Sequence, residues 1–491
     1  MDQLASNLPE ALNRAVSDYQ AGKLVEAEQL CEQIVAAKSD FFDALYLLAI
    51  VQMRLGKNDA ALANFDRALN LRPDSAQAHF NRGNVLPKLK RHDEAVASFD
   101  RAIDLRPDFA MAYSNRGNVL QTLKRFEEAV ASYDRALGLQ PSYAVAHYNR
   151  GLALHELRRC EEAVASYERA IDLRPGFAEA HLNQSLSRLV IGDFGRGWQE
   201  YEWRNKVKSP GNIWRNFTQP QWFGHENISG KTILLPAEQG FGDTIQFCRY
   251  VPLVAARGAR VVLEVLNPLA ELMTTLAGAS QIVCKDDPLP DYDIHCPLLS
   301  LPLAFGTRLE TIPSAVPYLR ASPQSVAEWD ARLGPKTRPR IGLAWSGEPT
   351  HPNDQNRSIP LNALLSPLDI DATFVSLQKD VRPSDATVLQ ARSDLRHFGA
   401  ALKNFSDTAA LVSNLDLVIS IDSSVAHLAG ALAKPVWVLL TFIPDWRWLL
   451  DRTDNPWYPT ARLFRQDDTR VWDNVIVRIH AALGDFVQSR L

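Results

Sequence analysis

The sequence predicts a multidomain protein in which an all-α solenoid of repeats is followed by a pair of α/β doubly wound (Rossmann-like) domains. Two observations support this prediction. Residues 1–208 repeat every 34 residues, and residues 231–491 alternate short β-prone runs with helical patterns. Repeats of this length form helical solenoids, whereas strands that alternate with helices form parallel sheets. A chain of 491 residues is long enough for several such domains.

Four kinds of residue recur within the repeats. They are Pro73, Pro107, Pro141 and Pro175; Gly83, Gly117 and Gly151; the alanine rows Ala61, Ala95, Ala129, Ala163 and Ala68, Ala102, Ala136, Ala170; and Phe65, Phe99, Tyr133 and Tyr167. A helix pair with small residues at the crossing and proline at its end resembles the tetratricopeptide repeat. The register indicates about five full repeats, with a degenerate sixth at residues 192–204. Pro87 is expected to kink or end its helix.

One polar position of the repeats predicts a binding surface. Asparagine recurs at the same place in the first helix of each pair, as Asn81, Asn115, Asn149 and Asn183. Solenoids present a concave surface, and an asparagine amide both donates and accepts hydrogen bonds, so this row can bind the backbone of an acceptor peptide. The alternative is that the asparagines only bond between neighbouring repeats.

The second half of the chain is predicted to be two α/β lobes. Residues 209–230 are a proline-, glycine- and aromatic-containing linker, residues 231–323 the N-terminal lobe, and residues 324–491 the C-terminal lobe. We expect strands at residues 232–235, 260–265 and 281–285, a further strand and loop within 291–302, and strands at 339–347, 372–378, 395–398, 417–421 and 436–440, with helices from about residue 245 and at 267–277, 361–367, 408–414 and 425–433. Paired domains of this type bind ligands in the cleft between them.

The clearest candidate site is the turn after the apolar run at residues 417–421. It consists of Asp422, Ser423 and Ser424, with His427 one turn inside the following helix. In an open α/β sheet such a turn lies at the ligand-binding edge, and the amides that begin the helix favour an anion such as phosphate. The alternative is that Asp422 or Ser423 only caps a buried helix.

A second turn, GFGD, follows the first strand of the N-terminal lobe. Gly240 and Gly242 would allow the backbone to approach a ligand, and Asp243 stands at the head of a helix. A carboxylate in this place can remove a proton from an acceptor hydroxyl, although it can equally be a helix cap.

Two cations and one amide lie just beyond strands of the C-terminal lobe. They are Arg357, in the loop after residues 339–347, and Gln378 with Lys379, at the end of the strand at residues 372–378. Cations at these places could neutralise a diphosphate, although Arg357 could also be a surface charge. Farther on, Trp446, Trp448, Trp457 and Tyr458 predict either a stacking surface or core between the lobes. No paired-acid or His/Cys pattern predicts a metal site.

The composition indicates which partners and which cellular compartment to expect. The net charge is only -4, and no block of Lys and Arg predicts nucleic acid or anionic membrane as a partner. The five cysteines show no CxxC pair, which favours a reducing cytoplasm over a disulfide framework. We expect neither a signal peptide nor a membrane span, because the start MDQLASNLPE is polar and no apolar run is long enough.

The motifs GFGDT and IDSSVAHLAGALAKPVWVLL together resemble the two-lobed (GT-B type) glycosyltransferases of the heptosyltransferase-like group, over residues 230–485. More distantly, the whole chain looks like the repeat-containing O-linked N-acetylglucosamine transferases, although their histidine motifs and inter-lobe insertion are not evident here. The resemblance implies that Asp243 is the general base and that Arg357 and the 422–427 turn bind the nucleotide diphosphate.

The sequence thus predicts a cytoplasmic, metal-independent glycosyltransferase. It would move a sugar from a nucleotide-activated donor to Ser or Thr of a protein that the repeats recruit. The sugar could be an N-acetylhexosamine, a heptose or another one. Two alternatives stay open: a non-catalytic scaffold with a degenerate transferase domain, and a transferase acting on lipid or oligosaccharide acceptors.

Overall fold

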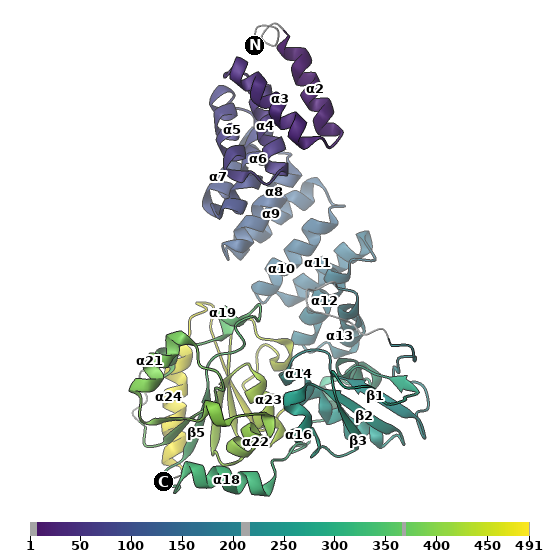
Figure 1. The fold of residues 1–491 in the computed structure, drawn as a ribbon, viewed down its shortest axis with the longest axis vertical. Coiled ribbons are helices and arrows are strands. Elements are labelled where there is room, and N and C mark those ends of the chain that lie inside the picture. The colour runs from purple at the N-terminus through teal and green to yellow at the C-terminus, as the bar shows by residue number, and fades with distance from the viewer. Residues whose placement is uncertain (1–6, 208–216, 366–369, 491) are drawn as a thin grey trace. The chain divides into compact units, whose positions relative to one another are not determined.

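The computed structural model describes residues 7–207, 217–365 and 370–490. The chain divides into two compact units, residues 1–184 and residues 185–491 (Figure 1). The described part of the first unit is helical, and the second unit contains two parallel sheets. The predicted fold class, a tetratricopeptide-type solenoid followed by two α/β domains, is therefore confirmed.

The helices of the repeats follow one another in six consecutive pairs along the chain (Figure 1). They are α2 (Leu8–Gln20) and α3 (Leu24–Ala37); α4 (Phe42–Arg54) and α5 (Asn58–Leu71); α6 (Ala76–Val85) and α7 (His92–Leu105); α8 (Ala110–Thr122) and α9 (Phe126–Leu139); α10 (Ala144–Glu156) and α11 (Cys160–Leu173); and α12 (Ala178–Val190) and α13 (Phe194–Tyr201). Pro87 has the expected effect, since α6 ends at Val85 and a 3-10 turn, η1 (Leu86–Leu89), replaces its last turn.

The recurring glycines are explained by close helix packing. Gly117 of α8 lies against the ring of Tyr133 of α9, and a Cβ at this position would be 2.7 Å from a ring carbon. Neighbouring repeats contain the same pairs, Gly83 with Phe99 and Gly151 with Tyr167. The alanines of both recurring rows are completely buried in the same helix crossings. Small side chains are therefore required where the two helices of a repeat meet.

A polar ladder also repeats through the first unit. The guanidinium of Arg116 donates to Asp100 of the preceding repeat (Nε to Oδ1, 2.6 Å) and to Ser132 of its own repeat (Nη1 to Oγ, 2.7 Å). Arg82 and Arg150 make equivalent bonds one repeat earlier and one later. The ladder ties each repeat to its neighbour through partly exposed charged groups.

The division between the two units falls inside α12, after Gln184. The helix α13 and the 3-10 turn η2 (Glu202–Asn205) therefore pack with the second unit, whereas the sequence places the end of the solenoid at residue 208. In η2, the buried Arg204 donates to Glu238 (Nη2 to Oε1, 3.0 Å) and to Glu202 (Nη1 to Oε1, 2.7 Å). Of the predicted linker, residues 209–216 lie outside the described residues.

The first lobe is built on a four-stranded parallel sheet with the order β3-β2-β1-β4. Its strands are β1 (Thr232–Pro236), β2 (Arg260–Val265), β3 (Ala279–Cys284) and β4 (Ile294–His295). Its helical elements are α14 (Phe241–Phe247), η3 (Cys248–Tyr250), α15 (Val251–Ala255), η4 (Asn267–Leu269), α16 (Ala270–Met273), η5 (Leu298–Ser300), α17 (Leu301–Ala304) and η6 (Leu309–Thr311). The strand order reverses between β1 and β4.

The second lobe is built on a six-stranded parallel sheet with the order β10-β9-β8-β5-β6-β7. Its strands are β5 (Arg340–Ala344), β6 (Thr373–Ser376), β7 (Leu395–His397), β8 (Leu417–Ile421), β9 (Val436–Leu440) and β10 (Ala461–Arg465). Its helical elements are α18 (Pro323–Leu333), α19 (Asp354–Arg357), α20 (Leu361–Leu365), α21 (Pro383–Ala391), η7 (Gly399–Ala401), α22 (Phe405–Ser413), α23 (Ser424–Ala431), η8 (Trp446–Trp448) and α24 (Asp473–Gln488). This is the doubly wound order, with its switch point between β5 and β8.

Two predicted helices differ from the structure. The first begins at Phe241 instead of near Ile245, because Gly240 and Asp243 form a capping arrangement at its start. The helix expected at residues 267–277 reaches only Met273, and the hydroxyls of Thr274 and Thr275 then bond to backbone carbonyls three residues earlier. Such local bonds compete with continuation of a helix.

Candidate functional site

The two candidate turns lie at the switch points of the two sheets. The turn that contains Gly240 follows β1, and the turn that contains Asp422 follows β8. In doubly wound sheets, ligands bind at the carboxyl ends of the strands on either side of a switch point. The topology therefore places both turns at the ligand-binding edges of their lobes.

The helices that follow these turns pack directly against each other. A Cβ on Gly242 of α14 would lie 2.9 Å from Cδ2 of His427 and 3.6 Å from Cα of Ser424, both in α23. Gly242 therefore allows the close approach of a protein helix, and the space beside it is filled by His427. Gly240 leaves more room, since only the carboxylate of Asp243 comes within 4 Å of its Cβ position.

Asp243 is both a helix cap and a member of a charged cluster. Its Oδ2 accepts a bond from the amide of Gly240 (2.9 Å), and its Oδ1 accepts from Nη2 of Arg447. Its side chain is 19% exposed. Burial raises the pKa of Asp243 above its usual value, while the charge of Arg447 acts in the opposite direction. The carboxylate is thus suited to accept a proton if the guanidinium leaves it.

In the turn after β8, one residue caps the following helix and another bonds to an arginine. Ser423 is the N-cap of α23, and its hydroxyl accepts from the amide of Val425 (3.3 Å), as the cap interpretation expects. The backbone carbonyl of Asp422 accepts from Nη1 of Arg357 (3.1 Å). Ser424 begins the helix beside Gly242. The turn is therefore capped and held by a cation from the β5–α19 loop region.

Asp422 and His427 have strongly shifted proton affinities. Burial, and then the charge of Asp445, raises the pKa of Asp422 to about 6. Burial, and then the charges of Arg447 and Arg249, lowers the pKa of His427 well below its usual value, so its imidazole is neutral at pH 7. Its Nδ1 is 3.0 Å from the hydroxyl of Tyr458, and its Nε2 is 4.0 Å from Oδ1 of Asp422.

Arg447 and Asp445 also belong to this cluster, and the sequence did not predict them as site residues. Both lie in the tryptophan-rich stretch that contains Trp446 and Trp448. Nη1 of Arg447 donates to Oδ1 of Asp445 (2.8 Å), which also accepts from the Arg447 amide (3.0 Å). The aromatic residues of that stretch form core, which is one of the two predicted alternatives. Trp446, Trp448, Trp457 and Tyr458 are at most 3% exposed. An arginine between two buried tryptophans was the available signal.

Two arginines at this site, the partly buried Arg357 and the buried Arg447, each have one buried nitrogen without a hydrogen bond in the described chain. Among the residues that the structure describes, the Nε atoms of Arg357 and Arg447 are buried without a hydrogen-bond partner. Both guanidiniums act electrostatically on Asp422. Because a buried donor without a partner is costly, each of these two N–H groups retains the capacity to donate to an acceptor such as an anionic oxygen.

The bonds of Gln378 and Lys379 are made to residues outside the 422–427 turn. The side chain of Gln378 is buried, and its Oε1 accepts from the amides of Trp345 (3.1 Å) and Ser346 (3.3 Å). Its Nε2 donates to the Ser346 hydroxyl (2.9 Å), so a ligand would have to replace bonds within the lobe. Lys379 is exposed and reaches the carbonyl of Lys403 (3.4 Å). Their part in nucleotide binding stays a prediction.

All four asparagines of the repeats bond to the preceding repeat. Their Nδ2 atoms donate to Tyr46 Oη (Asn81, 2.7 Å), Asn84 Oδ1 (Asn115, 2.8 Å), Asn118 Oδ1 (Asn149, 2.8 Å) and Tyr148 Oη (Asn183, 3.1 Å). This arrangement is the one expected if the row ties repeats together. An acceptor role of the row stays a prediction, and a peptide would meet amides that already donate within the solenoid.

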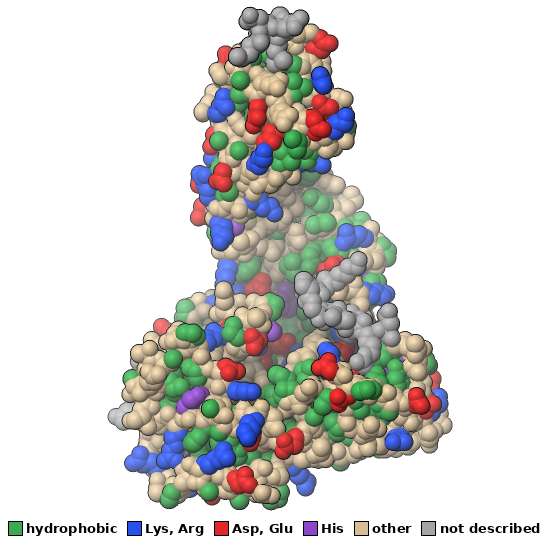
Figure 2. All heavy atoms as spheres, viewed as in Figure 1, with side chains coloured by type: hydrophobic (Ala, Val, Ile, Leu, Met, Phe, Trp, Pro, Cys, Tyr) green, Lys and Arg blue, Asp and Glu red, His purple; other side chains and the backbone are tan. Residues whose placement is uncertain are grey.

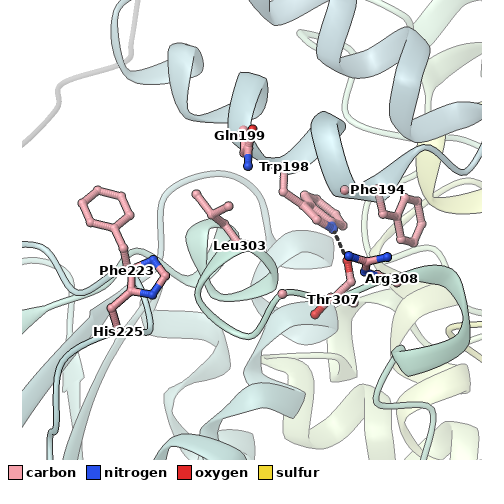
Figure 3. A pocket seen from close by; sticks show the side chains of 10 residues that line it. Phe194, Trp198, Gln199, Phe223, His225, Leu303, Thr307 and Arg308 are labelled. Carbon is pink, nitrogen blue, oxygen red and sulfur yellow. Dashed lines mark hydrogen bonds between the residues drawn. The ribbon is translucent and has the colours of Figure 1, made fainter.

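A separate pocket of about 550 Å³ lies within the second unit (Figure 3). Its walls include Phe194, Trp198, Phe223, His225, Leu303 and Arg308. The indole of Trp198 donates to the carbonyl of Thr307 (3.0 Å), drawn as a dashed line in Figure 3. The lining contains none of the residues predicted for the nucleotide site.

Over the described ranges, no group of three or more His, Cys, Asp and Glu side chains could hold a metal ion. No helix in those same ranges is long and apolar enough to cross a membrane. On the face shown in Figure 2, acidic and basic side chains are interspersed. Metal-independent chemistry and a cytoplasmic location stay predictions.

Comparison with known families supports the repeats. A tetratricopeptide repeat family matches residues 46–110, 114–176 and 148–196. The curated Protein FlbA of Caulobacter vibrioides is 26% identical over 329 residues, which are 61% of this chain and 54% of that protein. The chain thus spans about half the length of the curated relative that it matches.

Solved structures similar to this chain include two repeat proteins. YrrB, described as a TPR protein with an unusual peptide-binding site, is 22% identical, with a TM-score of 0.34, over 36% of this chain and 94% of that one. MamA from Desulfovibrio magneticus RS-1 is 21% identical, with a TM-score of 0.33, over 34% of this chain and 96% of that one.

Proposed function

We propose that this chain is a metal-independent glycosyltransferase of the GT-B type, which moves a sugar from a nucleotide-activated donor to a hydroxyl of an acceptor. The diphosphate of the donor would lie at the turn after β8, and Asp243 would accept the proton of the attacking hydroxyl. The hydroxyl oxygen would form a bond to the anomeric carbon as the bond from that carbon to the diphosphate breaks. The resemblance of both turns to heptosyltransferase-like enzymes supports this assignment.

The observation that carries the proposal is the meeting of two switch-point turns around buried charge. Asp243 comes from the first lobe, and Arg357 and Asp422 come from the second. Carboxylates with raised pKa values beside arginines with free N–H groups suit proton acceptance next to a charged leaving group.

The repeats support a protein as the acceptor. Tetratricopeptide solenoids present extended binding surfaces, so the first unit would recruit a polypeptide that carries the target Ser or Thr. Because the asparagine amides already donate to neighbouring repeats, side chains other than this row would supply much of the contact.

Direct titration of nucleotides tests the donor site. We expect a nucleoside diphosphate to bind the full chain in calorimetry and to raise its melting temperature, because a ligand specific for the folded state stabilises it. The Arg357→Ala variant should weaken binding on the order of tenfold, since a charge-assisted bond to phosphate is lost. Arg338→Ala is the matched control, because this exposed arginine of the second lobe pairs with Asp371 (2.6 Å) and is no part of the predicted nucleotide site.

Unchanged affinity in Arg357→Ala would contradict the assigned position of the diphosphate. A chain that binds neither nucleotides nor nucleotide-sugars would favour the scaffold alternative. If transfer occurs to a lipid or oligosaccharide but to no protein, the donor site would stand and the acceptor assignment would be wrong.

A further inference from the structure

We propose that Arg447 is a positioning residue that makes donor binding a precondition for base action: its guanidinium holds Asp243 in the ligand-free protein and moves to the diphosphate when the donor binds. This inference rests on the proposed function. It assigns a role to a residue that the resemblance to known transferases does not supply.

Arg447 joins the two lobes at the proposed base. It stands in η8 of the second lobe, and its Nη2 bonds to Asp243 in α14 of the first lobe. Because the other carboxylate oxygen accepts from the Gly240 amide, both oxygens of Asp243 have a donor in the ligand-free protein. A carboxylate that is paired with a guanidinium is a weaker base than an unpaired one.

The backbone of Arg447 is fixed, which leaves its head group as the part that can move. The carbonyl of Arg447 accepts from Nδ2 of Asn455 (2.8 Å), and its amide donates to Asp445. The guanidinium carbon lies 4.2 Å from the ring centre of Trp446 and 5.7 Å from that of Phe247. A rotation of the guanidinium between these rings would exchange one anionic partner for another without a shift of the main chain.

The guanidinium of Arg447 has an unused hydrogen-bond donor, its Nε atom. Arg447 is only 6% exposed, and among the described residues its Nε has no hydrogen-bond partner. A diphosphate presents several anionic oxygens and can accept from Nε and a terminal nitrogen together, whereas Asp243 accepts from one terminal nitrogen. A donor can therefore compete with Asp243 for the cation.

The groups that face Asp243 determine the sign of the effect. They are Arg447 of η8, Asp445 just before it, His427 of α23 where it packs against α14, Tyr201 of α13, and His351 of the loop before α19. With His427 and Tyr201 neutral at pH 7, Arg447 is the cation in contact with the carboxylate. Its departure would raise the proton affinity of Asp243, so donor binding should take up protons.

Calorimetry in buffers of different ionisation enthalpy measures this uptake. The probes are ADP, GDP, CDP and UDP, with inorganic pyrophosphate as the probe that lacks a base. In the wild type, we expect binding to take up more protons than in Asp243→Asn, by up to about one proton at mildly acidic pH. This Asp243-dependent uptake should disappear in Arg447→Met, because Asp243 has no guanidinium to lose.

The matched control is Arg357→Met. This variant removes a second, partly buried cation of the site. Arg357 bonds to the Asp422 carbonyl and not to Asp243, so affinity should fall while the Asp243-dependent uptake persists. Arg447→Lys keeps a cation and serves if Arg447→Met does not fold, as judged by circular dichroism. It should retain partial uptake, because an ammonium can exchange partners but cannot bond in a fork.

Each result has a distinct consequence. Equal Asp243-dependent uptake in the wild type and in the Arg447 variants would overturn the inference and leave the proposed function intact. Binding without any proton uptake would do the same. The absence of binding by every probe would overturn the proposed function and the inference with it.

Discussion

Arginines that are at least partly buried serve different purposes in the two units. In the first unit, Arg82, Arg116 and Arg150 repeat one arrangement, in which each guanidinium bonds to an aspartate of the preceding repeat and a serine of its own. In the second unit, Arg357 and Arg447 occur in no repeating pattern, and each buries an Nε without a hydrogen-bond partner in the described chain. Regular, satisfied polar contacts are typical of stability, and incompletely satisfied ones are typical of a ligand site.

The largest expected effect concerns chemistry in the second unit. Asp243→Asn should lower the rate of sugar transfer on the order of 10²- to 10⁴-fold, because a general base is removed. The capping bond from Gly240 can persist, since the asparagine amide also has an oxygen, so the melting temperature should change little. Transfer assays with the purified chain measure the rate, and transfer close to the wild-type level would eliminate Asp243 as the base.

Replacing an arginine by alanine should reduce the stability of the second unit more than that of the first. Arg204→Ala leaves the buried carboxylate of Glu238 without its cation, so we expect the second unit to lose about 3–5 kcal/mol. Arg116→Ala, the matched control in the first unit, should cost about 1 kcal/mol, because its aspartate partner is half exposed. Denaturant unfolding followed by tryptophan fluorescence measures the second unit. A cost for Arg204→Ala below that of Arg116→Ala would contradict this difference.

Asp422 should give the second unit a pH-dependent contribution to its stability. Burial raises the pKa of Asp422 to about 6 in the folded protein, above the usual value of an aspartate. The unfolded chain therefore loses this proton first, and the associated stability, fully present at low pH, is lost as pH rises from about 4 through 6. Asp422→Asn should be more stable than the wild type at pH 7, by about 1–3 kcal/mol, but not at pH 4. Parallel curves for both proteins across this range would refute the assignment.

A glycine pair in one repeat tests the packing of the first unit. Gly117→Ala places a Cβ 2.7 Å from the ring of Tyr133, which is held by bonds to Asn118 (2.7 Å) and Gln121 (2.8 Å). We expect a cost of about 1–2 kcal/mol from overpacking. Gly138→Ala, with nothing within 4 Å of its Cβ, should stabilise α9 by up to about 1 kcal/mol. Thermal unfolding of the two variants should therefore shift in opposite directions.

The smallest expected effect concerns the asparagine row. Asn149→Ala removes the bond to Asn118 and should cost about 0.5–1.5 kcal/mol. If the row only ties repeats together, the variant should bind an acceptor polypeptide as tightly as the wild type once both are folded. If the variant instead loses more free energy of peptide binding than of folding, the asparagine row contacts the peptide directly. Fluorescence anisotropy with a labelled acceptor peptide provides the measurement.

The sequence predicts the first unit well because its contacts are local. Every recurring glycine and alanine packs within its own repeat or the next one, so a spacing of 34 residues reports the structure directly. Most strands of the second unit were also predictable, since they are apolar runs between turn residues. The strand β10 was not predicted, because its sequence ARLFR has an arginine at its second and fifth positions.

The arrangement around Asp243 could not be predicted in the same way. Arg447 is 204 residues away along the chain, and no spacing rule links the two side chains. The position of Gly242 was predicted as an approach to a ligand, yet the approaching group is His427, because two lobes meet there. Asparagine identity alone also could not separate a peptide contact from a bond between repeats, since both use the same amide.

The placement of α13 limits how this protein can vary in length. Trp198 of α13 packs 5.1 Å from Trp446 of the second lobe and donates to Thr307 of the first lobe, so the final helix pair is part of the framework that holds both lobes. Units of 34 residues between positions 42 and 177 contact only their neighbours and could be gained or lost singly. Solenoids of many lengths could thus be joined to an unchanged second unit, provided that each ends in the same aromatic helix.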